Sequence, residues 1–236
     1  MIFYCKQFQI SQAKSAMKIS TDSLLLGSWA VIPKNCNSAL DIGSGTGIIS
    51  LMLAQKTNNC QIDAIEMDKN SYEESCDNFK NSCWSNRLSC FQTSWQDFVQ
   101  LDSQKKYDLI ISNPPFYSEN LPTNHSAKHV AKFQSSLPFD ELIFGVSKFL
   151  SNDGFFCLII PYKEKTKFIQ LAENQNLFVI KNTDVKGNEF VDFKRSLLAF
   201  SKNKSTYEID ELILETKRNQ YTEKYKNLTK EFYLNL

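Results

Sequence analysis

The stretch Ser38-Ala-Leu-Asp-Ile-Gly-Ser-Gly-Thr-Gly-Ile-Ile-Ser-Leu-Met-Leu-Ala54 decides the fold of this chain. Residues 39–42 are apolar except for one acid and predict a short buried strand, and the apolar run from residue 48 predicts a helix. The three glycines between them permit a tight turn that L side chains disfavour. Such a turn brings a ligand close to bare backbone and to the positive end of a helix dipole.

Asp41, at the end of the predicted strand, indicates which ligand binds there. A fixed carboxylate suits a cation, such as an ammonium or sulfonium group, far better than a pyrophosphate. The spacing Asp-Ile-Gly-Ser-Gly-Thr-Gly also differs from the dinucleotide form G-x-G-x-x-G. We therefore expect Asp41, Gly43, Gly45 and Gly47 to bind S-adenosyl-L-methionine. The alternatives are a nicotinamide cofactor and a strand–turn–helix without a ligand.

Glu66 is the next candidate for the cofactor site. Residues 61–65 predict a second strand that ends at Glu66, which lies 25 residues after Asp41. An open α/β sheet places an acid there to accept the ribose hydroxyls, and we include the adjacent Met67. The turn 92–97, after a third predicted strand, should border the adenine pocket, so that Ser94 and Trp95 are further candidates.

Strands and helices alternate along most of the chain. Further strands are predicted at 107–112, 154–160, 177–183 and 195–201, and helices at 20–30, 70–81, 139–150 and 163–173. This order predicts an α/β domain with a doubly wound, seven-stranded, mostly parallel sheet. Too few residues join the last two strands for a helical crossover, so we expect an antiparallel edge strand.

Two regions flank this pattern. Residues 1–36 should be an N-terminal extension packed on the domain, with a short strand or hairpin in the first ten residues and a helix after Ser20. Residues 37–236 should form the cofactor-binding domain. It should include a C-terminal helix, because apolar residues recur at helical spacing between residues 221 and 232.

Composition limits the remaining possibilities. The chain has 236 residues, of which 42% are hydrophobic, and can bury one full core. Its seven cysteines are scattered without a C-x-x-C pair, and His125 and His129 lack a nearby third ligand, so we expect neither disulfides nor a metal. There is no signal-peptide pattern and no apolar run of about 18 residues, which favours the cytoplasm and no membrane partner.

The motif Asn113-Pro-Pro-Phe116 directly follows the strand 107–112 and is the predicted catalytic loop. Paired prolines stiffen the turn. The Asn113 side-chain oxygen and the Pro114 carbonyl can accept the two protons of a planar nitrogen and aim its lone pair at a methyl group, while Phe116 stacks on the ring. We expect alignment to supply most of the catalysis. A base inside a stem would have to be everted to reach this loop.

The glycine motif, Glu66 and residues 113–116 together resemble the class I methyltransferases that modify planar nitrogen. Several further segments resemble the tRNA(Val) (adenine-37-N6) methyltransferase family over nearly the whole chain. They are Phe8-Gln-Ile, Ala16-Met-Lys-Ile-Ser-Thr-Asp-Ser-Leu-Leu-Leu-Gly27, Leu53-Ala-Gln-Lys-Thr57, Gly154-Phe-Phe-Cys157, Leu197-Leu-Ala-Phe-Ser201 and the closing residues 221–233.

This resemblance implies a Rossmann-like fold and methylation of adenine N6 next to the anticodon of a valine tRNA. It implies that residues 113–116, which include Pro115, form the catalytic loop. It also implies that Lys18, Thr21 and Asp22 lie near the methionine end of the cofactor. The family commonly has an acid where this chain has Ser94, so that contact with adenine is absent or passes to a neighbour such as Asp97. We expect a monomer.

The same catalytic loop occurs in methyltransferases that act on protein glutamine, such as that of a release factor, on a ribosomal RNA base, or on DNA adenine. A non-enzymatic RNA-binding protein is a second alternative. The match along the whole chain favours tRNA.

Overall fold

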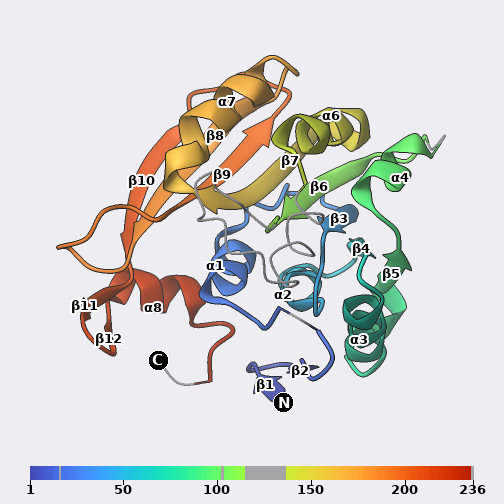
Figure 1. The fold of residues 1–236 in the computed structure, drawn as a ribbon, viewed down its shortest axis with the longest axis horizontal. Coiled ribbons are helices and arrows are strands. Elements are labelled where there is room, and N and C mark those ends of the chain that lie inside the picture. The colour runs from blue at the N-terminus through green and yellow to red at the C-terminus, as the bar shows by residue number, and fades with distance from the viewer. Residues whose placement is uncertain (16, 102–103, 115–136, 235–236) are drawn as a thin grey trace, which may run out of the picture.

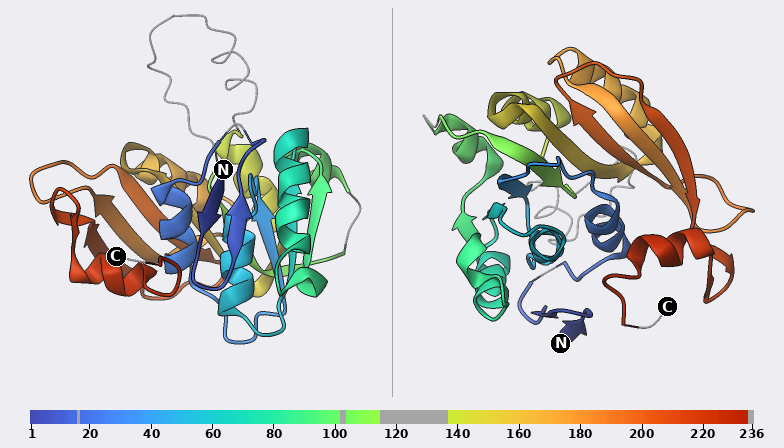
Figure 2. Two further views of the ribbon diagram at one scale, coloured as in Figure 1. Left: turned by 90° about the horizontal axis from the view of Figure 1, so that it is seen from below. Right: turned by 180° about the vertical axis from the view of Figure 1, so that it is seen from behind.

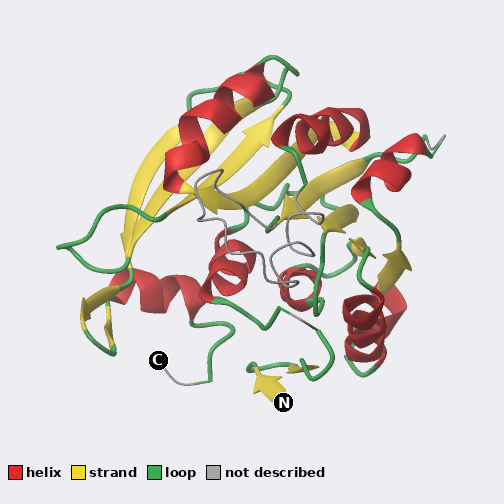
Figure 3. Cartoon of the chain, in the orientation of Figure 1, coloured by secondary structure: helices red, strands yellow, loops and turns green. Residues whose placement is uncertain are grey.

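The computed structural model describes residues 1–15, 17–101, 104–114 and 137–234. A central sheet lies between two layers of helices (Figure 1 and Figure 3). Its eight described strands are β3 (Ser38–Ile42), β4 (Gln61–Glu66), β5 (Leu88–Gln92), β6 (Tyr107–Ser112), β7 (Leu150–Pro161), β8 (Phe178–Lys186), β9 (Arg195–Ser201) and β10 (Glu208–Ile213). The helices are α1 (Thr21–Trp29), α2 (Ile48–Lys56), α3 (Lys69–Lys80), α4 (Trp95–Gln100), α6 (Phe139–Phe149), α7 (Lys165–Glu173) and α8 (Glu223–Thr229), with short 3-10 turns η1 (Ser85–Arg87) and η2 (Tyr162–Glu164).

The two helical layers rest on two separate apolar clusters, one on each face of the sheet. Alternation along β7 shows this division, because successive side chains of a strand point to opposite faces. Phe156, Leu158 and Ile160 belong to the cluster that contains residues of α4, α6 and α7. Cys157 and Ile159 belong to the other, which contains residues of α1, α2 and α8. The predicted doubly wound α/β class is therefore confirmed.

The strand order is β10-β8-β9-β7-β6-β3-β4-β5. Strands β3 to β7 pair in parallel, and β9 runs antiparallel to both β7 and β8. The prediction of seven strands was wrong by one, because β10 adds a parallel partner to β8. The antiparallel pairing does lie toward one edge, but β9 is inside the sheet and not at its edge.

The missed strand has a physical explanation. β9 ends at the side of the sheet where β8 begins, so the short connection 202–207 can start β10 parallel to β8. Its sequence Glu-Ile-Asp-Glu-Leu-Ile carries three acids, and only Leu212 is buried. An edge strand of this kind lacks the apolar run that marks a central strand.

The N-terminal hairpin is confirmed as β1 (Ile2–Tyr4) paired with β2 (Gln9–Ser11). Glu74 of α3 binds the segment that follows this hairpin. Its carboxylate accepts hydrogen bonds from the N–H groups of Ala13, Lys14 and Ser15 and from the hydroxyl of Ser15. Burial acts to raise the pKa of Glu74, but these donors together outweigh it and lower the pKa to about 2.

The C-terminal helix α8 is present but shorter than predicted. Residues before it form a small hairpin, β11 (Glu215–Lys217) with β12 (Gln220–Tyr221), and Asn219 there has a φ of 63°. Tyr225 and Phe232 are buried, and the tail reaches the N-terminal hairpin through the backbone of Lys6 and Phe232 (Figure 2). In the described part of the chain, no helix combines the length and apolar character needed to cross a membrane.

Candidate active site

The strands β3, β4 and β6 deliver their motifs to one edge of the sheet. β3 lies between the other two, with Ile42 opposite Ile65 on β4 and opposite Ser112 on β6. Because all three run parallel, the residues that follow them meet at their carboxyl ends, where open α/β sheets bind ligands. Asp41, within β3, and Asn113, directly after β6, therefore lie at the same end of adjacent strands and not on opposite sides of the molecule.

Asp41 is fully buried at this edge. Its Oδ2 accepts hydrogen bonds from the Ser50 hydroxyl at 2.7 Å and the Ser50 N–H at 3.1 Å. Its Oδ1 is buried without a hydrogen-bond partner among the described residues. Burial raises the pKa of Asp41 to about 7 against the effect of Ser50, and the charge of Glu66 adds to the rise. A cation reaching Oδ1 would satisfy this group, since an unpaired buried carboxylate is costly.

Most N–H groups of the glycine turn donate hydrogen bonds to acceptors within the protein. Gly43 and Ser44 donate to the Ile65 carbonyl, Gly45 donates to the Glu66 carboxylate, and Gly47 donates to the Ser44 carbonyl. A phosphate-binding loop must instead offer these groups to the ligand. With two acids beside it as well, this turn is unsuited to a pyrophosphate.

The three glycines differ in what surrounds them. All have positive φ, but a Cβ on Gly43 or Gly45 would meet nothing within 4 Å. A Cβ on Gly47 would lie 2.4 Å from the Phe79 ring and 2.8 Å from the Ser75 hydroxyl. Gly43 and Gly45 thus border open space in which a ligand can approach the backbone, whereas Gly47 allows α2 to pack closely on α3.

Glu66 ends β4 and is nearly buried. Its two oxygens accept hydrogen bonds from the N–H groups of Gly45 and Asp68, both at 2.8 Å. Burial raises the pKa of Glu66, and these donors oppose the rise. Each carboxylate oxygen has further lone pairs, so a diol can still bind here. The neighbouring Met67 is 54% exposed and is open to a flat ligand.

The end of β5 lies beside Glu66, because Thr93 donates its N–H to the Glu66 carbonyl. Ser94 caps α4, and its hydroxyl donates to the Asp97 carboxylate at 2.6 Å. An acid is therefore present at this position, supplied from three residues further along the chain. Trp95 packs in the core, because its ring is buried against Phe98 and its Nε1 donates to the Glu141 carbonyl.

Asn113 contacts a residue that sequence reasoning missed. Its Nδ2 donates to the Ser23 hydroxyl of α1 at 3.1 Å. This bond turns the amide so that Oδ1 remains to accept a proton from a substrate. Pro114 is buried, while Pro115, Phe116 and the two histidines lie outside the described residues. Ser23 and Asn113 are 90 residues apart in sequence and carry no shared motif that could have revealed the contact.

Two of the three candidates near α1, Lys18 and Asp22, have partners within the protein. Lys18 donates to the carbonyls of Gln12 and Ser15, and Thr21 is the exposed first residue of α1. Asp22 forms an ion pair with Arg195 at 2.7 Å, which ties α1 to the start of β9. These contacts occupy Lys18 and Asp22 in bonds within the protein.

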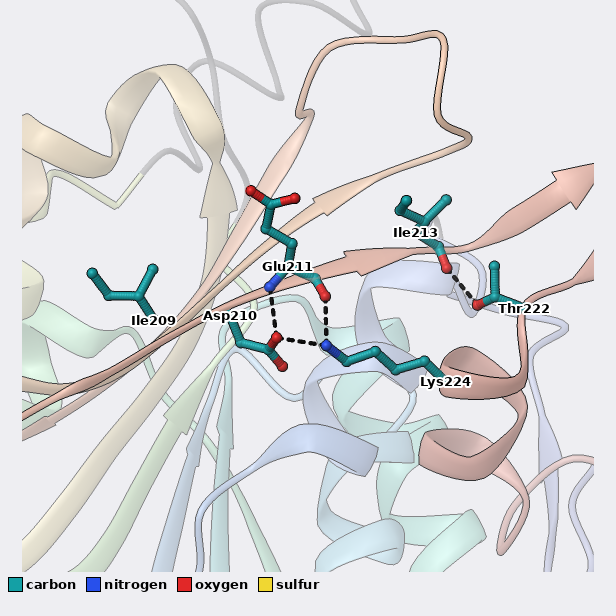
Figure 4. A pocket seen from close by; sticks show the side chains of 6 residues that line it. All are labelled: Ile209, Asp210, Glu211, Ile213, Thr222 and Lys224. Carbon is teal, nitrogen blue, oxygen red and sulfur yellow. Dashed lines mark hydrogen bonds and ion pairs between the residues drawn. The ribbon is translucent and has the colours of Figure 1, made fainter.

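One surface hollow lies away from this edge, between β10 and α8. It has a volume of about 550 Å³ and is lined by Ile209, Asp210, Glu211, Ile213, Thr222 and Lys224. Its polar groups bind one another, with Lys224 on Asp210 and on the Glu211 carbonyl (Figure 4). We assign no chemistry to it. Among the described residues, no cluster of three or more His, Cys, Asp or Glu side chains is placed to hold a metal ion.

Comparison with known proteins agrees with this geometry. Residues 15–167 match the methyltransferase small domain family. The chain is 49% identical over 235 residues to a tRNA1(Val) (adenine(37)-N6)-methyltransferase of Flavobacterium psychrophilum, covering 100% of both chains. It is 39% identical over 234 residues to a protein of the same name from Haemophilus influenzae, covering 98% of both.

Solved structures share the fold at low sequence identity. A predicted O-methyltransferase from Agrobacterium tumefaciens superposes with a TM-score of 0.68 at 17% identity, covering 89% of this chain and 96% of that one. A methyltransferase from Pyrococcus furiosus gives a TM-score of 0.56 at 20% identity, covering 84% and 90%. These similarities show the α/β fold alone.

Proposed function

The chain belongs to the tRNA1(Val) (adenine(37)-N6)-methyltransferase family, and we propose that its active site lies at the carboxyl ends of β3, β4 and β6. There it transfers a methyl group from S-adenosyl-L-methionine to N6 of adenine 37 in tRNA(Val). The observation that carries this proposal is the meeting of Asp41, Glu66 and Asn113 at one edge. A carboxylate that can bind a cation (Asp41), a carboxylate that can bind a diol (Glu66) and an amide that can accept a hydrogen bond from an amine (Asn113) then lie at the same edge.

Four residues are proposed to hold the cofactor. Asp41 Oδ1 faces its charged amino-acid end, Gly43 and Gly45 leave room for it, and Glu66 accepts the ribose hydroxyls. Bound there, S-adenosyl-L-methionine supplies an electrophilic methyl group. Met67, and Asp97 through its hydrogen bond to Ser94, are proposed to border the adenine ring, while Lys18, Thr21 and Asp22 support the site from the α1 side.

Asn113 is proposed to position the target nitrogen. The adenine amine is a poor nucleophile because its lone pair is delocalised into the ring. Hydrogen bonds from its two protons to Asn113 Oδ1 and the Pro114 carbonyl favour a more tetrahedral nitrogen with its lone pair directed at the methyl group. The N–C bond forms as the S–C bond breaks, and the proton leaves to solvent afterwards. Alignment of this kind can supply much of the rate.

The test is methylation of unmodified tRNA(Val) with labelled S-adenosyl-L-methionine, read by mass spectrometry of the nucleosides. We expect N6-methyladenosine in tRNA(Val) and none when adenine 37 is replaced by guanine. Asn113→Ala should lower kcat by roughly 10²-fold or more while the Kd of the cofactor changes little. Labelling of a release factor or ribosomal RNA with tRNA untouched would refute the proposal, as would binding of tRNA without methylation. We expect a monomer, which light scattering can check, and we expect the protein in the cytoplasm.

A further inference from the structure

A patch of partly exposed aromatic and basic side chains lies where β7, β8 and β9 meet the carboxyl edge of the sheet. It consists of Tyr162, Phe193, Phe190, Lys165 and Lys186, and we call it the rim patch. Phe190 is 91% exposed and Tyr162 is 38% exposed. Phe190 belongs to the loop between β8 and β9, which extends from the body of the domain (Figure 1). Nothing in the active site described above uses these side chains.

The inner part of the rim patch is ordered by its own contacts. The rings of Tyr162 and Phe193 are 5.2 Å apart with an interplanar angle of 34°. Lys165 Nζ lies 4.6 Å from the Tyr162 ring centre, and Lys186 Nζ lies 5.2 Å from that of Phe193. Backbone hydrogen bonds from Tyr162 to Lys194 and from Lys194 to Val185 hold the two segments together. The result is a preorganised row of two adjacent rings with an ammonium group at each end.

This row stands on the same edge as Asn113. Ser112 pairs with Leu158 on β7, and Pro161, just before Tyr162, pairs with Arg195 on β9. Two strand spacings and two residue rises separate Asn113 from the start of β9, which corresponds to about 12 Å. The ion pair of Arg195 with Asp22 also joins this region to α1, whose Ser23 holds Asn113.

The chemistry of the patch fits unpaired nucleotides. Aromatic faces stack on bases of any sequence, and adjacent ammonium groups attract phosphates. The same loop carries the acids Glu189 and Asp192, and Lys165 is paired with Asp184, so the surface lacks the dense positive charge that a duplex backbone would require. Stacking is therefore the main attraction, and it needs bases that are free of a helix. A base everted into the active site leaves such neighbours.

We propose that the rim patch binds unpaired nucleotides of the tRNA anticodon loop beside the target adenine. This inference rests on the proposed function. Tyr162 and Phe193 form the inner stacking surface, and Phe190 contacts the RNA further out. The patch would thus orient the loop so that only one adenine enters the site.

The variants Tyr162→Ala and Phe190→Ala test this proposal in the full-length protein with an unmodified anticodon stem-loop of tRNA(Val). We expect each to raise the KM and the Kd of the RNA by about 5- to 50-fold, with the Kd of S-adenosyl-L-methionine unchanged. Phe190→Trp and Tyr162→Phe should keep wild-type values because they preserve a ring. The matched control is Tyr207→Ala, an aromatic residue that is 51% exposed just before β10.

A spectroscopic signal separates stacking from a general loss of affinity. 2-Aminopurine placed next to adenine 37 should change its fluorescence on binding wild-type protein, and the change should be lost in Tyr162→Ala at saturating protein. Unchanged KM, Kd and fluorescence in both alanine variants would refute the proposed role of the rim patch. An equal loss of RNA affinity in Tyr207→Ala would also refute it. If wild-type protein methylates tRNA(Val) and the variants behave normally, only the patch is refuted. If it binds the stem-loop through the patch without methylating it, only the proposed function is refuted.

Discussion

Replacing Ser23 by alanine tests how Asn113 is oriented for its proposed role. The Ser23 hydroxyl accepts from Asn113 Nδ2 at 3.1 Å, and alanine removes this acceptor while leaving the helix cap by Ser20 intact. A neutral hydrogen bond of this kind contributes about 0.5–1.5 kcal/mol. If that energy serves to hold Asn113 Oδ1 toward the substrate, kcat should fall by about 2- to 13-fold. Stability should not fall, because alanine is the better helix former.

The assay is steady-state methylation of unmodified tRNA(Val), with the Kd of S-adenosyl-L-methionine measured by calorimetry. We expect the loss in kcat alone, and Ser23→Thr should restore it by returning a hydroxyl. Ser28→Ala is the control on the same helix, because the Ser28 hydroxyl is buried without a partner among the described residues. A wild-type kcat in Ser23→Ala, or an equal loss in Ser28→Ala, would refute the reasoning.

Three further predictions concern the cofactor site and the N-terminal segment. The pKa of Asp41 is raised to about 7, so a bound cation that lowers this pKa should release about half a proton at pH 7. The calorimetric heat of cofactor binding should then depend on the buffer, and Asp41→Asn should abolish that dependence. A heat that is the same in all buffers for the wild-type protein would exclude the contact. Gly47→Ala should destabilise the protein by about 2 kcal/mol or more in chemical denaturation, and Gly43→Ala by less. Both glycines have positive φ, but of the two only Gly47 has no room for a Cβ atom. The reverse order of the two losses would contradict the packing argument. The pKa of Glu74 is lowered to about 2, so its carboxylate stabilises the fold above about pH 4.5, and this contribution is lost as the pH falls toward 2. The difference in Tm between wild type and Glu74→Gln should therefore shrink on acidification. A Tm difference that stays constant with pH would argue against this role of Glu74.

Sequence reasoning identified most elements because their signals are local. The strand at 107–112 was predicted with the bounds that the structure has, since a central parallel strand is apolar throughout. The hairpin of β8 with β9 followed from the short connection between them. β10 was missed because an edge strand needs few apolar residues, and its pairing with β8 depends on where β9 ends.

The candidate site divides along the same lines. Asp41, Glu66 and Asn113 stood out in the sequence because each lies at or just after the carboxyl end of a predicted strand, and parallel strands bring those ends to one edge of the sheet. Their individual contacts were not visible there, since Ser23 meets Asn113 and Arg195 meets Asp22 only through packing between distant segments.

The sequence by itself therefore determined the family and the fold class, and it indicated the edge of the sheet at which we propose the active site, because periodicity and motif spacing act over a few residues. Only the tertiary structure decided which glycines border open space, that Trp95 is buried in the core, and that an aromatic patch stands on the same sheet edge as Asn113. Those outcomes depend on how side chains from separate elements share space, and no local pattern encodes that.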